Sequence, residues 1–234
     1  MSTLGPANHS GVQALSTHGP IMSHGRSDRL RRLRGLYAIT PAADAPDTRH
    51  ARVAAVLTGG ATVLQYRDKA SSDGARLEQA RALRKLAAQH AALFIVNDDP
   101  RLAAQVEADG VHLGQDDGDI ASARALVGPD ALIGVSCYGD LNLAQRAIAA
   151  GADYIAFGAA FASPTKPDAA HAPIALFQAA RARWTLPIVA IGGIRPDNAP
   201  VLVDAGVDAL AVISALFDAP DPQAAAAQFA SFYR

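Results

Sequence analysis

Charged and amide side chains gather where three short apolar runs of the sequence end. The first of these runs ends in residues 65–69, Gln-Tyr-Arg-Asp-Lys. Because side chains alternate along a strand, Gln65, Arg67 and Lys69 share one face. Two cations on a face that points into a barrel mouth are costly unless they meet carboxylates or an anionic ligand. This run predicts an anion site, and the alternative is an exposed strand end where Asp68 pairs locally.

Carboxylates at the ends of the next two runs predict a site for a divalent cation. These runs end in Asn97-Asp98 and in Asp116-Asp117. The two runs should form neighbouring strands, so Asp98 and Asp117 can approach one cation. Two carboxylates plus water suit Mg²⁺, which often shares phosphate oxygens with a substrate. Zinc is not expected, because no histidine has a partner at ligand spacing. His112 falls in the register opposite to Asp117, and we predict that it packs against a helix.

Hydroxyls, glycines and one further cation follow the later runs. Ser136 has no histidine near it in the sequence, so we interpret it as a hydrogen-bonding group and Cys137 as a packing residue. Residues 163–166, Ser-Pro-Thr-Lys, form either an anion-binding loop or an ordinary surface turn. Gly192-Gly193 follows the seventh run, and Ser214 follows the eighth. Barrels of alternating strands and helices often bind phosphate at these two places.

The elements that must position these groups alternate regularly from Gly35 onward. Eight apolar runs span residues 35–40, 62–69, 92–98, 110–115, 132–137, 154–158, 187–193 and 209–214. Helical periodicity begins near residues 49, 74, 100, 119, 140, 174, 197 and 222. Eight such pairs in about 200 residues predict an α/β protein with a single (β/α)8 TIM barrel, whose reacting groups lie at the carboxyl ends of the strands. A doubly wound sheet would normally carry fewer strands and a Gly-rich turn after the first one.

Composition narrows the class of protein further. The chain has 234 residues, 50% of them hydrophobic, and a formal net charge of -1, which gives no global argument for binding nucleic acid or an anionic membrane. The single Cys137 cannot form an intramolecular disulfide, so a reducing cytoplasm is expected. No apolar run approaches the ~18 residues of a membrane span. Residues 1–34 are predicted to be a solvated, flexible extension, and residues 35–234 the barrel.

Seven short motifs, in order and each at a predicted strand end, resemble the thiamine-phosphate synthase family. They are QYRDK at 65–69, ND at 97–98, GQDD at 114–117, GVS at 134–136, PTK at 164–166, IGGI at 191–194 and IS at 213–214. The likeness covers essentially all of residues 35–234. One loop departs from the family pattern: residues 161–166 read Phe-Ala-Ser-Pro-Thr-Lys, where the family usually has Phe-Pro-Thr-x-Thr-Lys.

The resemblance implies a transferase of thiamine biosynthesis that joins 4-amino-2-methyl-5-(diphosphooxymethyl)pyrimidine to a thiazole phosphate. Thiamine phosphate and diphosphate would be the products, and Mg²⁺ would assist a dissociative substitution. The residues implied to bind the pyrimidine diphosphate are Gln65, Tyr66, Arg67, Asp68, Lys69, Asn97, Ser136 and Lys166. Those implied to act in catalysis are Arg67, Lys69, Ser136 and Lys166. Those implied to bind the thiazole phosphate are Ser163, Pro164, Thr165, Gly193, Ile213 and Ser214, and Asp98 and Asp117 would bind the metal.

Two alternatives share the expected fold. A thiazole tautomerase would use a positioned acid or base, typically histidine, and no metal, whereas the predicted mouth offers carboxylates and cations. A noncatalytic barrel that binds thiazole phosphate would not need Asp98, Asp117 and Lys166 together. The expected partners are two small-molecule substrates, with no nucleic acid and no membrane, and a homo-oligomer stays open.

Overall fold

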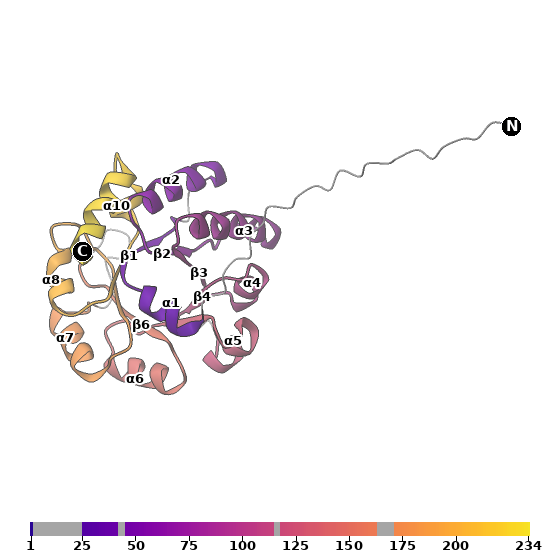
Figure 1. Ribbon diagram of the computed structural model, residues 1–234. Coiled ribbons are helices and arrows are strands. Elements are labelled where there is room, and N and C mark those ends of the chain that lie inside the picture. The colour runs from indigo at the N-terminus through magenta and orange to yellow at the C-terminus, as the bar shows by residue number, and fades with distance from the viewer. Residues whose placement is uncertain (2–24, 42–44, 115–117, 163–170) are drawn as a thin grey trace.

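Eight parallel strands close into a barrel in the computed structural model, which describes residues 1, 25–41, 45–114, 118–162 and 171–234 (Figure 1). The strands are β1 (Gly35–Ile39), β2 (Val63–Tyr66), β3 (Leu93–Asn97), β4 (Gly110–Leu113), β5 (Leu132–Ser136), β6 (Tyr154–Phe157), β7 (Ile188–Ile191) and β8 (Ala209–Val212). They follow one another around the barrel in chain order, and β1 pairs with β8 to close it. The predicted (β/α)8 barrel is confirmed.

Helices alternate with the strands and surround the barrel (Figure 1). They are α2 (Pro46–Thr58), α3 (Asp73–Gln89), α4 (Pro100–Gln105), α5 (Ile120–Val127), α6 (Leu141–Ala149), α7 (Ile174–Arg183), α8 (Ala199–Asp204) and α10 (Pro222–Ala230), with a short α9 (Ser214–Phe217) directly after β8 and a 3-10 turn at Ser231–Tyr233. The side chains of Asp99, Asp119, Asp140 and Asp221 each accept a backbone N–H in the first turn of the helix that follows. These caps satisfy N–H groups that a helix leaves unpaired, so local sequence sets where these helices begin.

The side chains of each strand divide between two apolar layers. One layer lies between the strands and the helices. The other fills the barrel and consists of Leu33, Tyr37, Ile39, Val63, Leu93, Ile95, Leu132, Tyr154, Ala156, Val189, Ala209 and Ala211. Glycine makes room for the largest ring of this interior, because a Cβ built on Gly134 would lie 2.0 Å from Cζ of Tyr154. Both faces of the strands are therefore buried and mostly apolar, which is typical of a parallel barrel.

An aspartate recurs one residue before β4, β6 and β8. Asp109, Asp153 and Asp208 each accept a backbone N–H from the preceding strand, at 2.9, 2.8 and 2.8 Å. Each carboxylate also pairs with an arginine of the helix that leads into the preceding strand, and these are Arg84 of α3, Arg124 of α5 and Arg181 of α7. The repeated ion pair ties a helix to the amino-terminal end of the barrel at three places.

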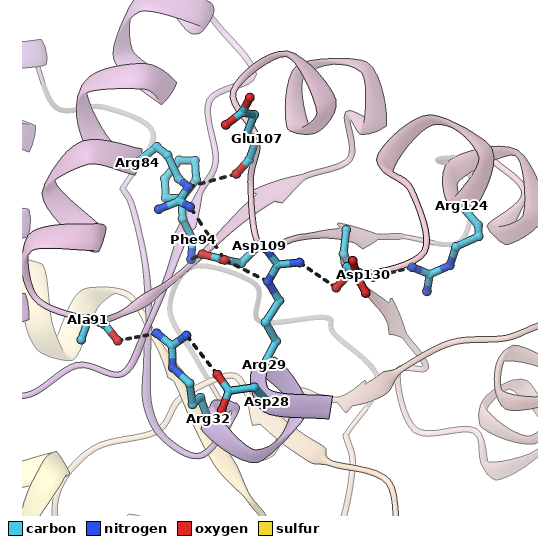
Figure 2. Close-up of polar contacts among 11 residues, drawn as sticks. Asp28, Arg29, Arg32, Arg84, Ala91, Phe94, Glu107, Asp109, Arg124 and Asp130 are labelled. Atoms are coloured by element: carbon cyan, nitrogen blue, oxygen red, sulfur yellow. Dashed lines mark hydrogen bonds and ion pairs between the residues drawn. The ribbon is translucent and has the colours of Figure 1, made fainter. Parts of the chain in front are cut away.

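Residues 25–34 differ from the expected solvated tail, because they pack on the barrel. Helix α1 (Arg26–Arg32) lies across the amino-terminal ends of the strands (Figures 1 and 2). Arg29 Nε donates to Asp109 at 3.1 Å, and its Nη1 donates to the carbonyl of Asp130 at 2.7 Å. Leu33 is buried in the interior layer. The arginines that suggested a solvated segment find carboxylates and carbonyls there, whereas residues 2–24 lie outside the described part of the chain.

Candidate active site

The residues predicted to bind an anion lie at and just after the carboxyl end of β2. The Gln65 side chain is buried and its Nε2 donates to the hydroxyl of Tyr37 at 2.8 Å, inside the barrel. Arg67 is partly buried, and its backbone N–H donates to the hydroxyl of Thr40 at 2.9 Å, which ties the ends of β1 and β2 together. The alternation predicted for this run holds, since Tyr66 belongs to the apolar layer under the helices.

Asp68 also points to the helical layer, so neither it nor Tyr66 contributes a side chain to the mouth. The Asp68 carboxylate pairs with Arg49 of α2 at 3.1 Å, and both side chains are buried. It accepts N–H bonds from Ala70 and Ser71 at 3.0 Å each. Burial pushes the pKa of Asp68 upward, but these hydrogen bonds, that of the Ser71 hydroxyl and that of Arg49 outweigh it and lower the pKa to about 2. Asp68 thus anchors the loop that carries the two cations on either side of it.

Lys69 and Asp98 meet at the mouth. The Lys69 ammonium lies 2.7 Å from Oδ2 of Asp98, and the Asp98 side chain is 22% exposed. Asn97 precedes it at the end of β3 and is partly buried. The next residue, Asp99, serves as the cap of α4 and pairs with Arg76 at 2.9 Å, so its carboxylate has a structural role. The second predicted metal ligand, Asp117, lies outside the described residues.

His112 points into the barrel, which corrects the prediction that it packs against a helix. Its Nδ1 lies 3.1 Å from the hydroxyl of Tyr154, and its Nε2 lies 2.9 Å from Oγ of Ser136. Val111 and Leu113, on either side, face the helices instead. The prediction failed because both faces of a barrel strand are buried, so an apolar side chain does not mark the interior. Burial lowers the pKa of His112 to about 4, with Asp98 opposing the shift.

The remaining predicted residues divide between described and undescribed segments. Ser136 is partly buried at the end of β5 and meets His112, as a hydrogen-bonding role requires. Cys137 is buried, and its burial raises the pKa of the thiol to about 12, as befits a packing residue. Gly193 has a φ of +63°, and a Cβ there would lie 2.6 Å from the carbonyl oxygens of Phe161 and Ala162. Ile213 is the residue before α9, which begins at the exposed Ser214. Ser163, Pro164, Thr165 and Lys166 lie outside the described residues.

Two polar residues of the interior, Tyr37 and Tyr154, were not predicted from the sequence. Tyr37 and Tyr154 join their hydroxyls at 3.0 Å, and His112 continues the contact toward Ser136. Both tyrosines are fully buried, and burial raises the pKa of each hydroxyl above its ordinary value. A signal for them did exist, since a tyrosine in an otherwise apolar strand needs a hydrogen-bond partner when it is buried.

The arrangement has the features of a (β/α)8-barrel enzyme. Cations, carboxylates and amides converge on the carboxyl ends of β2 and β3, where barrel enzymes hold their active sites. Among the described residues, no group of three or more His, Cys, Asp or Glu side chains is arranged to hold a metal ion. No helix in the same ranges combines the length and apolar character needed to cross a bilayer.

Comparisons with known proteins place this barrel in one family. The family model described as thiamine monophosphate synthase matches residues 36–216. A thiamine-phosphate synthase of Thioalkalivibrio sulfidiphilus is 54% identical over 204 residues, which cover 86% of this chain and 96% of that protein. The thiamine-phosphate synthase of Methylobacillus flagellatus is 56% identical over 199 residues, covering 84% of this chain and 94% of that protein. The chain therefore belongs to the thiamine monophosphate synthase family.

A solved structure agrees with this assignment. Thiamine phosphate pyrophosphorylase from Pyrococcus furiosus aligns with a TM-score of 0.78 at 35% identity, over 87% of this chain and 96% of that chain. The resemblance seen in the sequence is confirmed, and with it a transferase-type enzyme of thiamine biosynthesis that acts on small molecules. The sequence argument against a tautomerase, that the mouth offers carboxylates and cations in place of a histidine, no longer holds, because His112 lies inside the barrel. The relatives, rather than that argument, decide for the synthase.

Proposed function

We propose that the chain condenses 4-amino-2-methyl-5-(diphosphooxymethyl)pyrimidine with a thiazole phosphate to give thiamine phosphate and diphosphate. The observation that carries this proposal is the contact of Lys69 with Asp98 beside the strand end that holds Arg67. A diphosphate needs cations, and a divalent metal ion that accompanies it would need a carboxylate ligand nearby. The mouth brings both kinds of group to one place.

The described half of the proposed metal site fits Mg²⁺. Asp98 offers a hard oxygen ligand at a partly exposed position, which leaves room for the water ligands that Mg²⁺ retains. We propose that Asp98 and Asp117 hold the ion. When bound, Mg²⁺ supplies positive charge to the leaving diphosphate oxygens.

The residues of the chain then have distinct tasks. The C–O bond between the pyrimidine methylene carbon and the diphosphate breaks, and the thiazole nitrogen forms the new C–N bond. That nitrogen carries no proton, so no general base is needed. Arg67, Lys69 and Lys166 stabilise the negative charge that grows on the leaving group, and Asn97, Gln65 and Ser136 orient the pyrimidine. Ser163, Thr165, Gly193 and Ser214 hold the thiazole phosphate.

A product assay tests the proposal. Purified protein is given both phosphorylated substrates with Mg²⁺, and thiamine phosphate and diphosphate are measured together. Equal amounts of the two products are expected, and none when either substrate is omitted. Formation of a rearranged thiazole from the thiazole phosphate alone would instead favour the tautomerase. Full turnover in excess chelator would contradict the metal assignment. The cytoplasm as the compartment stays a prediction that rests on the single cysteine.

A further inference from the structure

A chain of hydrogen bonds crosses the interior of the barrel from β2 to β5. It begins at Gln65, passes through Tyr37, Tyr154 and His112, and ends at Ser136. The successive distances between donor and acceptor atoms are 2.8, 3.0, 3.1 and 2.9 Å. Gln65 and the three middle side chains are buried, and Ser136, the last residue of β5, is partly buried.

Each link of the chain limits the next, because a tyrosine hydroxyl has one proton to donate. The amide nitrogen of Gln65 can only donate, so the Tyr37 oxygen accepts from it. A buried hydroxyl proton needs an acceptor, and the only acceptor that the Tyr37 hydroxyl meets among the described residues is the oxygen of Tyr154, so Tyr37 donates to Tyr154. The proton of Tyr154 is then left for Nδ1 of His112. All the hydrogen bonds of the chain therefore run in one sense, from Gln65 toward Ser136.

The sense of the chain determines the tautomer of the histidine. Both ring nitrogens of His112 meet uncharged hydroxyls in a buried interior, an environment that favours the neutral imidazole. A neutral imidazole has one N–H, and Nδ1 accepts, so the proton is on Nε2. Nε2 then donates to Oγ of Ser136, and the hydroxyl proton of Ser136 is left to donate elsewhere.

We propose that Tyr37, Tyr154 and His112 are positioning residues that decide which groups at the mouth donate hydrogen bonds to the ligand and which accept them. Gln65 presents Oε1 as an acceptor, and Ser136 presents its hydroxyl proton as a donor. The identity of the ligand rests on the proposed function. A 4-aminopyrimidine presents an amino donor beside a ring-nitrogen acceptor, which complements this pattern. The 4-oxo analogue presents a carbonyl acceptor and a ring N–H donor. Its carbonyl would face the acceptor of Gln65, and its N–H would face the donor of Ser136. This chain of hydrogen bonds therefore favours the 4-aminopyrimidine over the 4-oxo analogue.

The tautomer is measured directly on the wild-type protein by ¹⁵N NMR of the histidine rings, without substrate. A single form of His112, protonated on Nε2 and bare on Nδ1, is expected. The Tyr154→Phe variant keeps the ring and loses the hydroxyl, so Nδ1 loses its donor and two tautomers should appear. Tyr233→Phe removes a partly buried hydroxyl, which donates to the carbonyl of Val207, and should leave the His112 signal unchanged. A wild-type His112 protonated on Nδ1, or an equal mixture, would overturn the proposal.

Kinetics with the two pyrimidine diphosphates test the consequence for specificity. Wild-type protein should prefer the 4-amino substrate over the 4-oxo analogue by about 10²-fold or more in kcat/KM, as expected where a site hydrogen-bonds its substrate. Tyr154→Phe should reduce that ratio by about tenfold, through KM for the pyrimidine, with KM for the thiazole phosphate unchanged. An unchanged ratio, or equal changes in both KM values, would show that Tyr154 only supports the fold.

Failure of this inference is distinguishable from failure of the proposed function. If wild-type protein makes no thiamine phosphate, the proposed function fails. The NMR measurement still decides whether the hydrogen bonds run from Gln65 toward Ser136. If wild-type protein turns over and His112 is protonated on Nδ1, the proposed function stands and the inference fails.

Discussion

The ammonium of Lys69 lies 2.7 Å from the carboxylate of Asp98, where the neighbouring strands β2 and β3 end at the barrel mouth. The pair joins a cation proposed to hold diphosphate to a carboxylate proposed to hold a metal ion. The Lys69 side chain is 59% exposed, so the pair contributes at most about 1 kcal/mol to stability. Substitutions at this place should therefore affect activity far more than folding.

Asp98→Asn should lower kcat/KM by about 10²-fold and raise the Mg²⁺ concentration needed for half-maximal rate, because the amide is neutral and a weaker ligand. The rate is measured against Mg²⁺ concentration. Asp99→Ala is the matched control from the adjacent position: it removes the cap of α4 and should cost about 1 kcal/mol of stability without changing the Mg²⁺ dependence. Equal Mg²⁺ dependence of Asp98→Asn and wild type would contradict the assignment.

Lys166→Ala should lower kcat more than Ser214→Ala, by about 10²-fold against less than tenfold. Lys166 is assigned to charge that grows during the reaction, whereas Ser214 is assigned to a phosphate that the reaction leaves unchanged. Rates at saturating concentrations of both substrates give the comparison. Equal losses of kcat in the two variants would reject this division of roles.

Acid should remove the stabilisation that comes from the Asp68 carboxylate. Its pKa is lowered to about 2 in the folded protein, against about 3.8 when unfolded, so its contribution is complete above the unfolded pKa. The contribution is lost as the pH falls through these two values, and it amounts to about 2 kcal/mol. The free energy of unfolding, measured from pH 6 to pH 2, should lose this amount in wild type and not in Asp68→Asn. Parallel curves for the two proteins would refute the claim.

Helix α1 should stabilise the barrel through Arg29. Arg29→Ala removes one ion pair with Asp109 and one bond to a carbonyl, and it should cost about 2–3 kcal/mol. Arg31→Ala is the control, because Arg31 is 71% exposed and should cost no more than about 0.5 kcal/mol. Denaturant unfolding measures both. Activity per folded molecule should stay unchanged in both variants, since α1 lies at the end of the barrel opposite to the mouth.

Gly134→Ala should destabilise the barrel interior. The new Cβ would lie 2.0 Å from Cζ of Tyr154, so the ring must shift, and such overpacking costs about 1–3 kcal/mol. Gly74→Ala offers a control in the first turn of α3, where no atom lies within 4 Å of the new Cβ. That change should stabilise the protein by about 0.5–1 kcal/mol. A neutral Gly134→Ala would show that the interior has unused space at this position.

Local patterns in the sequence determined the order of the elements and much of the mouth. Apolar runs mark the strands, and capping aspartates such as Asp99 and Asp140 mark helix starts, because both depend on residues close in the chain. The positions of Gln65, Asp98 and Ser136 follow, since the carboxyl ends of parallel strands meet at one end of a barrel.

Only the tertiary structure decided which way His112 points and where the arginines of α1 bind. A barrel strand is buried on both faces, so alternation cannot tell its interior from its helical side, and the partners of His112 come from β5 and β6. Arg29 likewise meets Asp109, which is distant in the chain and near only once the strands have closed. Contacts between remote segments depend on the register of the whole barrel, and no local spacing encodes that register.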